Sequence, residues 1–179
     1  MPLRMTRSEF RRWAEQQPKG RFERVAGEVV AMTPERIAHV ELKNNIWRAL
    51  DDAVRAAGLA CQALGDGVTV EVDKDTDYEP DAVVNCGEKL DPDAIAAPNP
   101  VIVVEVLSPS TQSTDTGEKL ADYFRLPSVQ HYLIVGTRRR EIIHHRRVGH
   151  GIETRIIGSG RIQLDPPGIG LDLDDVYRS

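Results

Sequence analysis

Apolar residues recur along the chain with two different periods, one typical of helices and the other of strands. Between Thr33 and Gly58 they recur three or four residues apart, which predicts a long helix with one inward-facing stripe. Thr33 and Pro34 suit the first positions of that helix, and Gly58 suits its end. A shorter helix is predicted over residues 8–17. The stripe of the long helix comprises Val40, Ile46, Trp47, Leu50, Ala53, Val54 and Ala57.

Strands are predicted by alternation and by continuous apolar runs. Residues 21–34 have the pattern of a β-hairpin around Ala26 and Gly27. Residues 60–73 contain two short strands on either side of a glycine-containing turn. The run PVIVVEVL, residues 100–107, is almost wholly apolar, which is typical of a central strand covered on both faces. Further strands are predicted over residues 79–86, 129–136, 140–147 and 152–158.

A third helix, predicted over residues 114–126, lies between two of these strands. A helix in that position can act as the crossover between neighbouring parallel strands. We therefore predict an α/β fold with a mixed central sheet flanked by helices, plus an N-terminal hairpin. The chain has no repeat, low-complexity segment or clear linker, so residues 1–179 are expected to form a single domain.

The composition is that of an ordinary globular protein. Charged residues make up 28% and hydrophobic residues 40% of the chain, and the net charge of −5 does not favour a strong non-specific polyanion binder. No apolar run approaches the roughly 20 residues of a membrane helix, and the N-terminus lacks the apolar core of a signal peptide. We therefore expect no membrane association and a cytoplasmic location. Cys61 and Cys86 lack the spacing of a zinc motif, and both are expected to be reduced.

Glu105 lies in the middle of the most apolar predicted strand. A lone buried carboxylate costs several kcal/mol unless it is paired. Three explanations are open: a structural arginine or lysine pairs with it, a metal ion binds it, or the strand reaches water at that point.

Asp81 begins a neighbouring predicted strand, directly after Pro80. Adjacent strands lie only about 4.8 Å apart, so the carboxylates of Asp81 and Glu105 can converge on one face. Two such charges about 4 Å apart repel by about 4 kcal/mol at an effective dielectric near 20, and a cation such as Mg²⁺ removes that penalty. The alternative for Asp81 is an everyday Pro-Asp turn.

Lys119 is predicted to lie in the first turn of the third helix, from which it can reach back to the preceding strand. A cation there opposes the helix dipole, so a nearby anionic group must favour it. That group is either the carboxylate cluster with a bound phosphate or a simple surface partner, Asp115.

The segments EPDAVV and VIVVEVLSPSTQSTDTGEKLADYF resemble the Uma family of endonucleases, which belongs to the restriction-endonuclease-like PD-(D/E)XK superfamily. The resemblance extends over nearly the whole chain, from RFERVAGEVVAMTP through AHVELKNNI to PGIGLDLDDVY. It implies a restriction-endonuclease-like core in which Asp81 and Glu105 bind the metal. Leu107 stands where the superfamily has its lysine, and the matching lysine is Lys119.

Two further departures from the family pattern lie in the late strand. The usual Tyr-Trp pair is Tyr132 and Leu133 here, and Gly136 replaces an aspartate that commonly ends that strand. These changes reflect either packing variation or a degenerate, inactive copy.

The resemblance implies a Mg²⁺-dependent endonuclease, also served by Mn²⁺, that hydrolyses phosphodiester bonds in DNA. Lys119 would orient the nucleophile or stabilise charge on the phosphoryl oxygens. His39, on the stripe of the long helix, and Glu28, after the hairpin glycine, are additional catalytic candidates. The alternatives are a structural histidine and a surface glutamate.

DNA contact has a local basis in the arginine-rich segment at residues 138–147, which could instead be a solvated hairpin edge. Cleavage of both strands would need two sites, so a homodimer is expected by analogy. Two other functions remain open: a catalytically inactive nucleic-acid-binding or assembly protein on the same fold, and a metal-dependent phosphoesterase with a smaller substrate.

Overall fold

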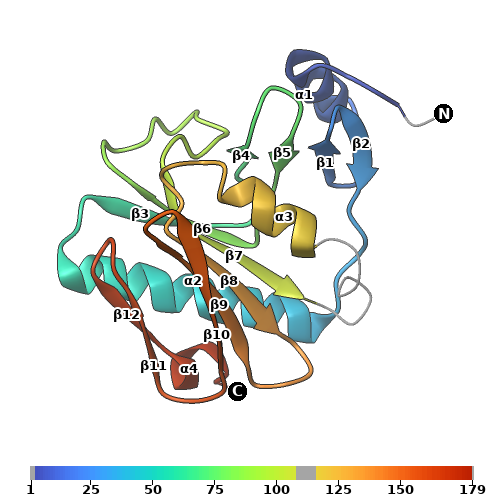
Figure 1. The fold of residues 1–179 in the computed structure, drawn as a ribbon. Coiled ribbons are helices and arrows are strands. Elements are labelled where there is room, and N and C mark those ends of the chain that lie inside the picture. The colour runs from blue at the N-terminus through green and yellow to red at the C-terminus, as the bar shows by residue number, and fades with distance from the viewer. Residues whose placement is uncertain (1–2, 108–115, 179) are drawn as a thin grey trace.

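A computed structural model describes residues 3–107 and 116–178 of the chain (Figure 1). The helices are α1 (Arg7–Glu15), α2 (Ile37–Ala57), α3 (Thr116–Tyr123) and α4 (Leu173–Val176). The strands are β1 (Phe22–Val25), β2 (Glu28–Ala31), β3 (Cys61–Gly65), β4 (Val70–Glu71), β5 (Asp77–Tyr78), β6 (Ala82–Cys86), β7 (Pro100–Leu107), β8 (His131–Gly136), β9 (Ile142–Val148), β10 (Gly151–Ile157), β11 (Arg161–Leu164) and β12 (Ile169–Asp172).

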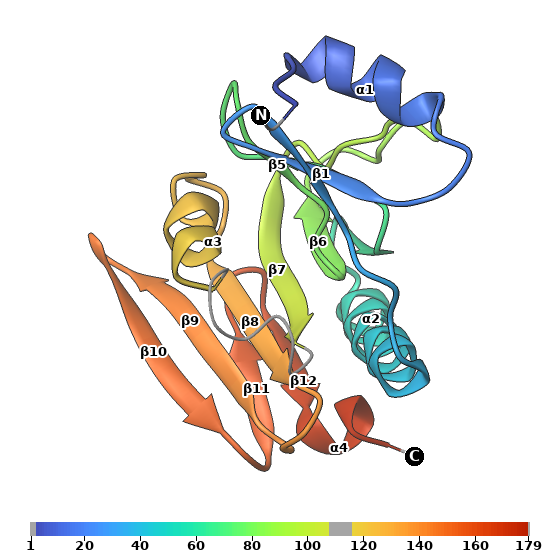
Figure 2. The same cartoon turned by 90° about the vertical axis from the view of Figure 1, so that its right-hand side faces the viewer.

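A mixed six-stranded sheet forms the centre of the molecule, with strand order β10-β9-β8-β7-β6-β3. β7 and β8 are parallel and α3 connects them, whereas the other neighbours in this sheet are antiparallel. Helices α2 and α3 lie on opposite faces of the sheet (Figure 2). The predicted α/β fold with a crossover helix is therefore confirmed.

Each face of the central sheet has its own apolar core. On one face α2 contributes Ile46 and Leu50, which are fully buried against the sheet and the C-terminal elements. On the other face Tyr123 of α3 packs with Tyr132 of β8, their ring centroids 5.1 Å apart. Burial on both faces explains why β7 is an almost continuous apolar run.

A smaller four-stranded sheet, in the order β2-β1-β5-β4, lies beside α1 (Figure 1). It contains the predicted N-terminal hairpin, with Phe22 paired to Ala31 and Val25 to Glu28. The two strands predicted within residues 60–73 both exist, but β3 joins the central sheet and β4 joins this smaller one. No helix in the described part of the chain is both long and apolar enough to cross a membrane.

The start of α2 differs from the prediction. The helix begins at Ile37, and Arg36 before it is extended, with φ −79° and ψ 154° and no side-chain cap bond. The segment directly before the helix stays extended, and the Glu35 carboxylate in that segment accepts a hydrogen bond from Lys43. The predicted end is confirmed, since Gly58 follows the helix in the left-handed conformation with φ 62°.

The predicted inward-facing stripe of α2 is only partly confirmed. Ile46, Leu50 and Val54 are buried, whereas Val40 and Trp47 keep 42% and 37% of their surface exposed. Leu42, which the predicted stripe omitted, is buried as well.

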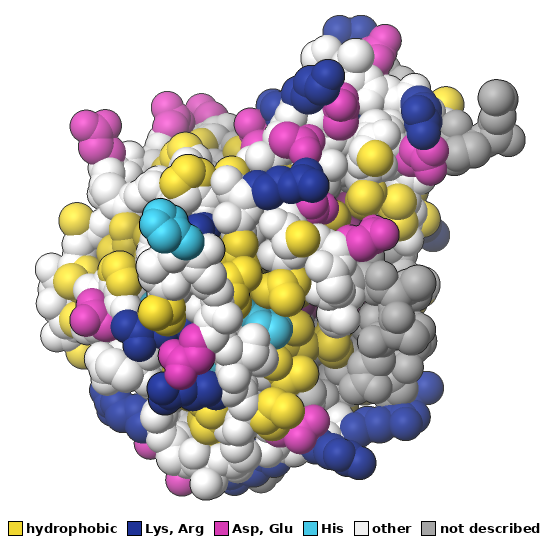
Figure 3. Space-filling view, in the orientation of Figure 1, with side chains coloured by type: hydrophobic (Ala, Val, Ile, Leu, Met, Phe, Trp, Pro, Cys, Tyr) yellow, Lys and Arg dark blue, Asp and Glu magenta, His cyan; other side chains and the backbone are white. Residues whose placement is uncertain are grey.

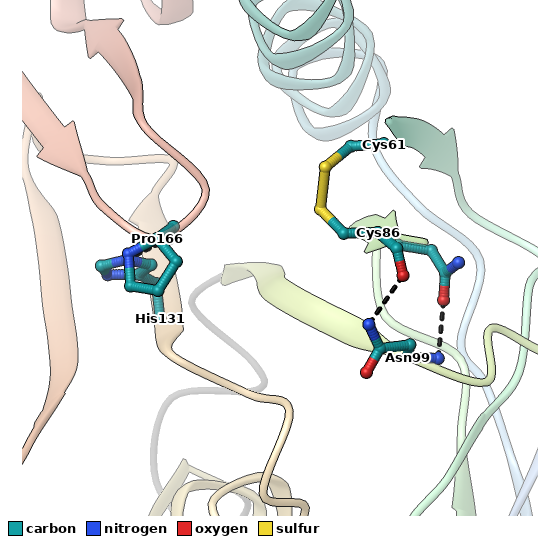
Figure 4. The surroundings of a disulfide bond; sticks show 6 residues. Cys61, Cys86, Asn99, His131 and Pro166 are labelled. Carbon is teal, nitrogen blue, oxygen red and sulfur yellow. Dashed lines mark hydrogen bonds between the residues drawn. A yellow bond between two sulfur atoms is a disulfide. The ribbon is translucent and has the colours of Figure 1, made fainter. Parts of the chain in front are cut away.

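The expectation of two reduced cysteines was wrong. Cys61 and Cys86 form a disulfide between β3 and β6 (Figure 4). They lie directly opposite each other in the antiparallel register, with Cα atoms 4.0 Å apart. Their separation of 25 residues contains no motif, so only the pairing of the strands brings the two thiols together.

Candidate active site

Asp81 and Glu105 meet where β6 begins beside β7. Ala82 pairs with Val104, so continuing the antiparallel register places Asp81 opposite Glu105. The Asp81 amide donates to the Val104 carbonyl over 3.0 Å, and the Val106 amide donates to Asp81 Oδ2 over 2.6 Å. Both side chains are buried, with 6% and 8% of their surfaces exposed. The two predicted carboxylates therefore lie side by side.

Lys119 reaches this pair from α3, as predicted. Its Nζ lies 3.1 Å from Glu105 Oε1, and the Tyr123 hydroxyl donates to the same oxygen over 2.8 Å. Lys119 and Tyr123 are four residues apart on a helix, so they share the face that packs against β7. The alternative partner, Asp115, lies outside the described residues. Within the described residues, a buried lysine holds a buried carboxylate next to Asp81.

The N-terminal hairpin supplies Glu23 to the cluster, and Glu28 lies elsewhere. Lys119 Nζ is 3.2 Å from Glu23 Oε1, and the Glu79 amide donates to that same oxygen over 2.9 Å. Glu28 instead pairs with Arg4 over 2.9 Å, and about a third of its side chain, 34%, is exposed. The hairpin thus brings a carboxylate to the cluster from β1 and not from β2. The available signal was an acidic residue between apolar Phe22 and Val25.

The first turns of α2 bring His39 and Lys43 to the other side of Asp81. His39 Nε2 lies 3.8 Å from Asp81 Oδ2 and 4.0 Å from Glu35 Oε1. Lys43 Nζ lies 3.0 Å from Asp81 Oδ1, 2.7 Å from Glu35 and 2.5 Å from Asp66. Sequence reasoning selected His39 but missed Lys43 and Glu35. The spacing of His39 and Lys43 on one helical face was the available signal.

Two cavities open beside this cluster and share residues Glu35 and Asp81. One, of about 500 Å³, is lined by the acidic and basic residues of the cluster: Glu23, Glu35, Arg36, His39, Asp81, Glu105 and Lys119. The other, of about 510 Å³, continues along α2 past Lys43 and Trp47. The cluster is therefore buried at its base and accessible from a pocket.

Burial raises the pKa of Glu105 to about 7. The nearby Lys119 ammonium lowers that pKa, whereas the charges of Asp81 and Glu23 raise it further. Near neutral pH the Glu105 carboxyl is therefore partly protonated.

Asp81 behaves differently. Burial opposes its ionisation, but His39, Lys43 and the Val106 amide together hold its pKa below the ordinary value. Asp81 therefore ionises more readily than its neighbour Glu105. Two facing carboxylates, one of them with a pKa raised mainly by burial, suit the oxygen-ligand chemistry of a divalent cation such as Mg²⁺.

Comparison with known proteins assigns the chain to a family. Residues 7–174 match the Uma2 family, which is described as "Putative restriction endonuclease". The chain belongs to the Uma2 family. An uncharacterized protein of Synechocystis sp. is 27% identical over 182 residues, covering 98% of this chain and 92% of the relative. The resemblance noted in the sequence is therefore confirmed.

A solved structure shares the fold of this Uma2 protein. It is the crystal structure of a "putative nuclease" of the DUF820 group from Anabaena variabilis, with a TM-score of 0.72 over 97% of both chains. The sequence identity is 15%, so the likeness concerns the fold. The predicted α/β core with a mixed central sheet is therefore shared with this structure.

The departures from the family pattern have structural explanations. Gly136 ends β8 where an added Cβ would lie 2.9 Å from the Arg139 carbonyl oxygen, so no side chain fits there. Leu133, which stands in place of the tryptophan, is fully buried in the core on the α2 face of the sheet. Leu107, at the end of β7, packs against the apolar core beneath α3.

Proposed function

We propose that this Uma2 protein is a divalent-metal-dependent endonuclease that hydrolyses phosphodiester bonds in DNA, with Asp81 and Glu105 as the metal ligands. The observation that carries the proposal is the approach of Lys119 Nζ to within 3.1 Å of Glu105, on the strand paired to Asp81. An acidic pair and a lysine at the base of a pocket suit metal-assisted phosphodiester hydrolysis, since the carboxylates can bind the ion and the ammonium can stabilise developing charge.

Mg²⁺ is the proposed cofactor, and Mn²⁺ is expected to substitute for it. Such an ion would polarise the scissile phosphate and lower the pKa of a bound water. Asp81 is already ionised beside Lys43, and Glu105 would release its proton when a cation binds. The metal site is therefore expected to take up its ion more tightly as the pH rises towards neutrality.

Lys119 is the proposed electrostatic group of the reaction. Its ammonium lies between Glu105 and Glu23, 3.1 Å and 3.2 Å from their carboxylate oxygens. With a cation held by Asp81 and Glu105, the Lys119 ammonium would be available to orient the attacking water or to stabilise charge on the phosphoryl oxygens. Tyr123 would hold the Glu105 carboxylate in orientation through its hydroxyl. Removal of Lys119 should therefore lower the rate of hydrolysis more than the affinity for DNA.

DNA is proposed as the substrate on family grounds and on local charge. Arg138 and Arg139 are exposed in the turn between β8 and β9, where they are free to contact a phosphate backbone. Arg147 of the same segment is structural, because its guanidinium donates to the carbonyls of Phe124 and Val129. Basic and acidic side chains are interspersed on the face shown in Figure 3, so any backbone contact there is local.

A second candidate function is an inactive nucleic-acid-binding or assembly protein. It is favoured by the ammonium groups of Lys43 and Lys119, which lie 3.0 Å from Asp81 and 3.1 Å from Glu105 and offset the charges of these carboxylates. A phosphoesterase with a small substrate is a third candidate, since the pocket of about 500 Å³ would hold a nucleotide.

The deciding experiment incubates the protein with plasmid and single-stranded DNA, with and without Mg²⁺ or Mn²⁺. Metal-dependent cleavage that disappears in Asp81→Ala and Lys119→Ala supports the proposal. Glu28→Gln is the matched control, because Glu28 forms an exposed ion pair away from the cluster; loss of cleavage in it would reinstate Glu28 as a catalytic residue. Binding without cleavage would favour the second candidate, and hydrolysis of small phosphodiesters alone the third.

We also propose that the protein works as a homodimer. β10 is an edge strand of the central sheet, and its Ile152 and Ile156 are 43% and 70% exposed. An antiparallel copy centred on Thr154 would place each of these isoleucines opposite the other and Glu153 opposite Arg155. Light scattering should give a dimer for the wild type and a monomer for Ile156→Lys. Ile95→Lys, at another exposed isoleucine, should remain dimeric.

The cytoplasm is the proposed location, since a nuclease of this kind meets DNA there. Disulfides are rare in that compartment, so the state of the Cys61–Cys86 bond in cells tests the proposed location. Trapping free thiols during lysis, followed by mass spectrometry, measures this directly. Full oxidation in the trapped sample would contradict the proposed location.

A further inference from the structure

The imidazole of His39 is buried next to two carboxylates without a hydrogen bond at Nε2. His39 is 9% exposed, and its Nε2 has no hydrogen-bond partner within the described residues. Asp81 Oδ2 at 3.8 Å and Glu35 Oε1 at 4.0 Å face this nitrogen. Both distances exceed those of a hydrogen bond. A buried polar nitrogen without a hydrogen-bond partner lowers stability, so we expect a bound group in the space in front of Nε2.

Three potential ligands surround that space. One nitrogen of His39 and one oxygen each from Glu35 and Asp81 lie within 4.8 Å of one another. Ligand bonds of about 2.0–2.2 Å around a tetrahedral ion place neighbouring ligand atoms about 3.4 Å apart. The observed separations of 3.8 and 4.0 Å therefore need to shorten by only a few tenths of an ångström. Glu35 is partly exposed, which leaves an entry path from the pocket.

We propose that Glu35, His39 and Asp81 form a second metal site that binds a divalent transition-metal ion such as Zn²⁺, Co²⁺ or Mn²⁺. Imidazole nitrogen suits these ions, whereas Mg²⁺ prefers an all-oxygen set. The site differs from the proposed Mg²⁺ position because it uses neither Glu105 nor Lys119. Asp81 is common to both, and in that respect alone the inference rests on the proposed function.

The two faces of Asp81 explain how it can serve both positions. Its Oδ1 is held by Lys43 at 3.0 Å, whereas Oδ2 accepts from the Val106 amide and faces His39. A carboxylate can bridge two ions about 3.5–4 Å apart, as in two-metal phosphodiesterases. Lys43 also anchors Glu35, at 2.7 Å, so the second carboxylate is positioned before any ion arrives.

Metal uptake by the full chain tests the site without reference to DNA cleavage. The probes are Co²⁺, followed by its visible absorption, and Zn²⁺ and Mg²⁺, followed by titration calorimetry. The wild type is expected to bind Co²⁺ and Zn²⁺ more tightly than Mg²⁺. His39→Ala should weaken Zn²⁺ binding at least about tenfold, the loss that removal of even an outer-shell partner commonly causes. The same variant should leave Mg²⁺ binding within about twofold, since that site has oxygen ligands.

Two variants serve as controls. His150→Ala, in the exposed turn between β9 and β10, should bind Co²⁺ as the wild type does. Glu105→Gln should lose Mg²⁺ binding but keep the Co²⁺ absorption. If the His39 variant fails to fold, Glu35→Gln removes another proposed ligand of this site and none of the Mg²⁺ site, so it should weaken Zn²⁺ and Co²⁺ binding in the same way.

Each outcome separates this inference from the nuclease proposal. Unchanged Zn²⁺ and Co²⁺ binding in His39→Ala, or loss of the Co²⁺ absorption in Glu105→Gln, would overturn the second site. His39-dependent metal uptake in a protein that cleaves no DNA would overturn the nuclease proposal and keep the site.

Discussion

Replacing Glu105 by glutamine should alter the free energy of unfolding, and the change should favour the variant more and more as the pH rises. Burial raises the pKa of Glu105 to about 7, from an ordinary value of 4.5. Between these values the folded carboxyl keeps its proton while the unfolded one has lost it, so the free energy of unfolding falls as the pH rises. The stabilising proton is fully present below pH 4.5 and its contribution is lost through about pH 7.

The size of the effect follows from the shift in pKa. A rise from 4.5 to about 7, at about 1.4 kcal/mol per pH unit, corresponds to about 3 kcal/mol. Glutamine does not titrate, and its amide oxygen can still accept from Tyr123 and Lys119. The difference in unfolding free energy, variant minus wild type, should therefore rise by about 3 kcal/mol between pH 4.5 and pH 8.

Urea unfolding in the presence of a chelator, repeated across this pH range, measures the difference. Other titrating groups are shared by the two proteins, so they largely cancel. A difference that stays constant with pH, or that moves against the variant as the pH rises, would refute the reasoning.

A divalent ion supplies an independent check. Mg²⁺ at about 100 times its dissociation constant should stabilise the wild type by about 2.7 kcal/mol at neutral pH. The Glu105→Gln variant should gain much less, because it has lost a proposed ligand. Equal stabilisation of the wild type and the variant by Mg²⁺ would mean that Glu105 is not a ligand of the ion.

Three further changes test the structure around the site. Lys119→Met leaves two buried carboxylates without their ammonium, so urea unfolding at pH 8 should show a loss of about 3–5 kcal/mol, and Lys119→Arg should lose less. The Cys61–Cys86 bond closes a loop of 25 residues, so its reduction should lower the free energy of unfolding by about 3.5 kcal/mol. Urea unfolding with and without a reductant measures this loss, and no change would mean that the bond does not restrict the unfolded chain. Ile46→Ala should cost about 2–5 kcal/mol by thermal unfolding because Ile46 is fully buried, whereas Ile37→Ala, at a residue 79% exposed, should stay within about 0.5 kcal/mol.

Local spacing determined most of the secondary structure. The apolar run of β7 and the three-and-four spacing of α2 each reflect how often a side chain returns to the same face, a property of neighbouring residues alone. The crossover by α3 followed from the order of the elements, because parallel neighbours need a long connection. The start of α2 was misplaced, since Glu35, in the segment directly before the helix, is held by Lys43 from within the helix.

Part of the candidate site was also visible in the sequence. Glu105 stood out because a carboxylate in an apolar strand needs a partner, and Asp81 because it begins a neighbouring strand. Lys119 followed from its position one helix later. These inferences needed only the expectation that adjacent segments pack together.

Only the tertiary structure decided which residues from distant segments complete the cluster. Glu23 and Glu28 lie on the same hairpin, yet the packing of that hairpin brings Glu23 to Lys119 and leaves Glu28 with Arg4. The same holds for Cys61 and Cys86, which become neighbours through the register of β3 and β6. Side-chain periodicity depends only on consecutive residues. Strand order and register depend instead on how the whole sheet minimises its exposed apolar surface. No short stretch of sequence contains that information.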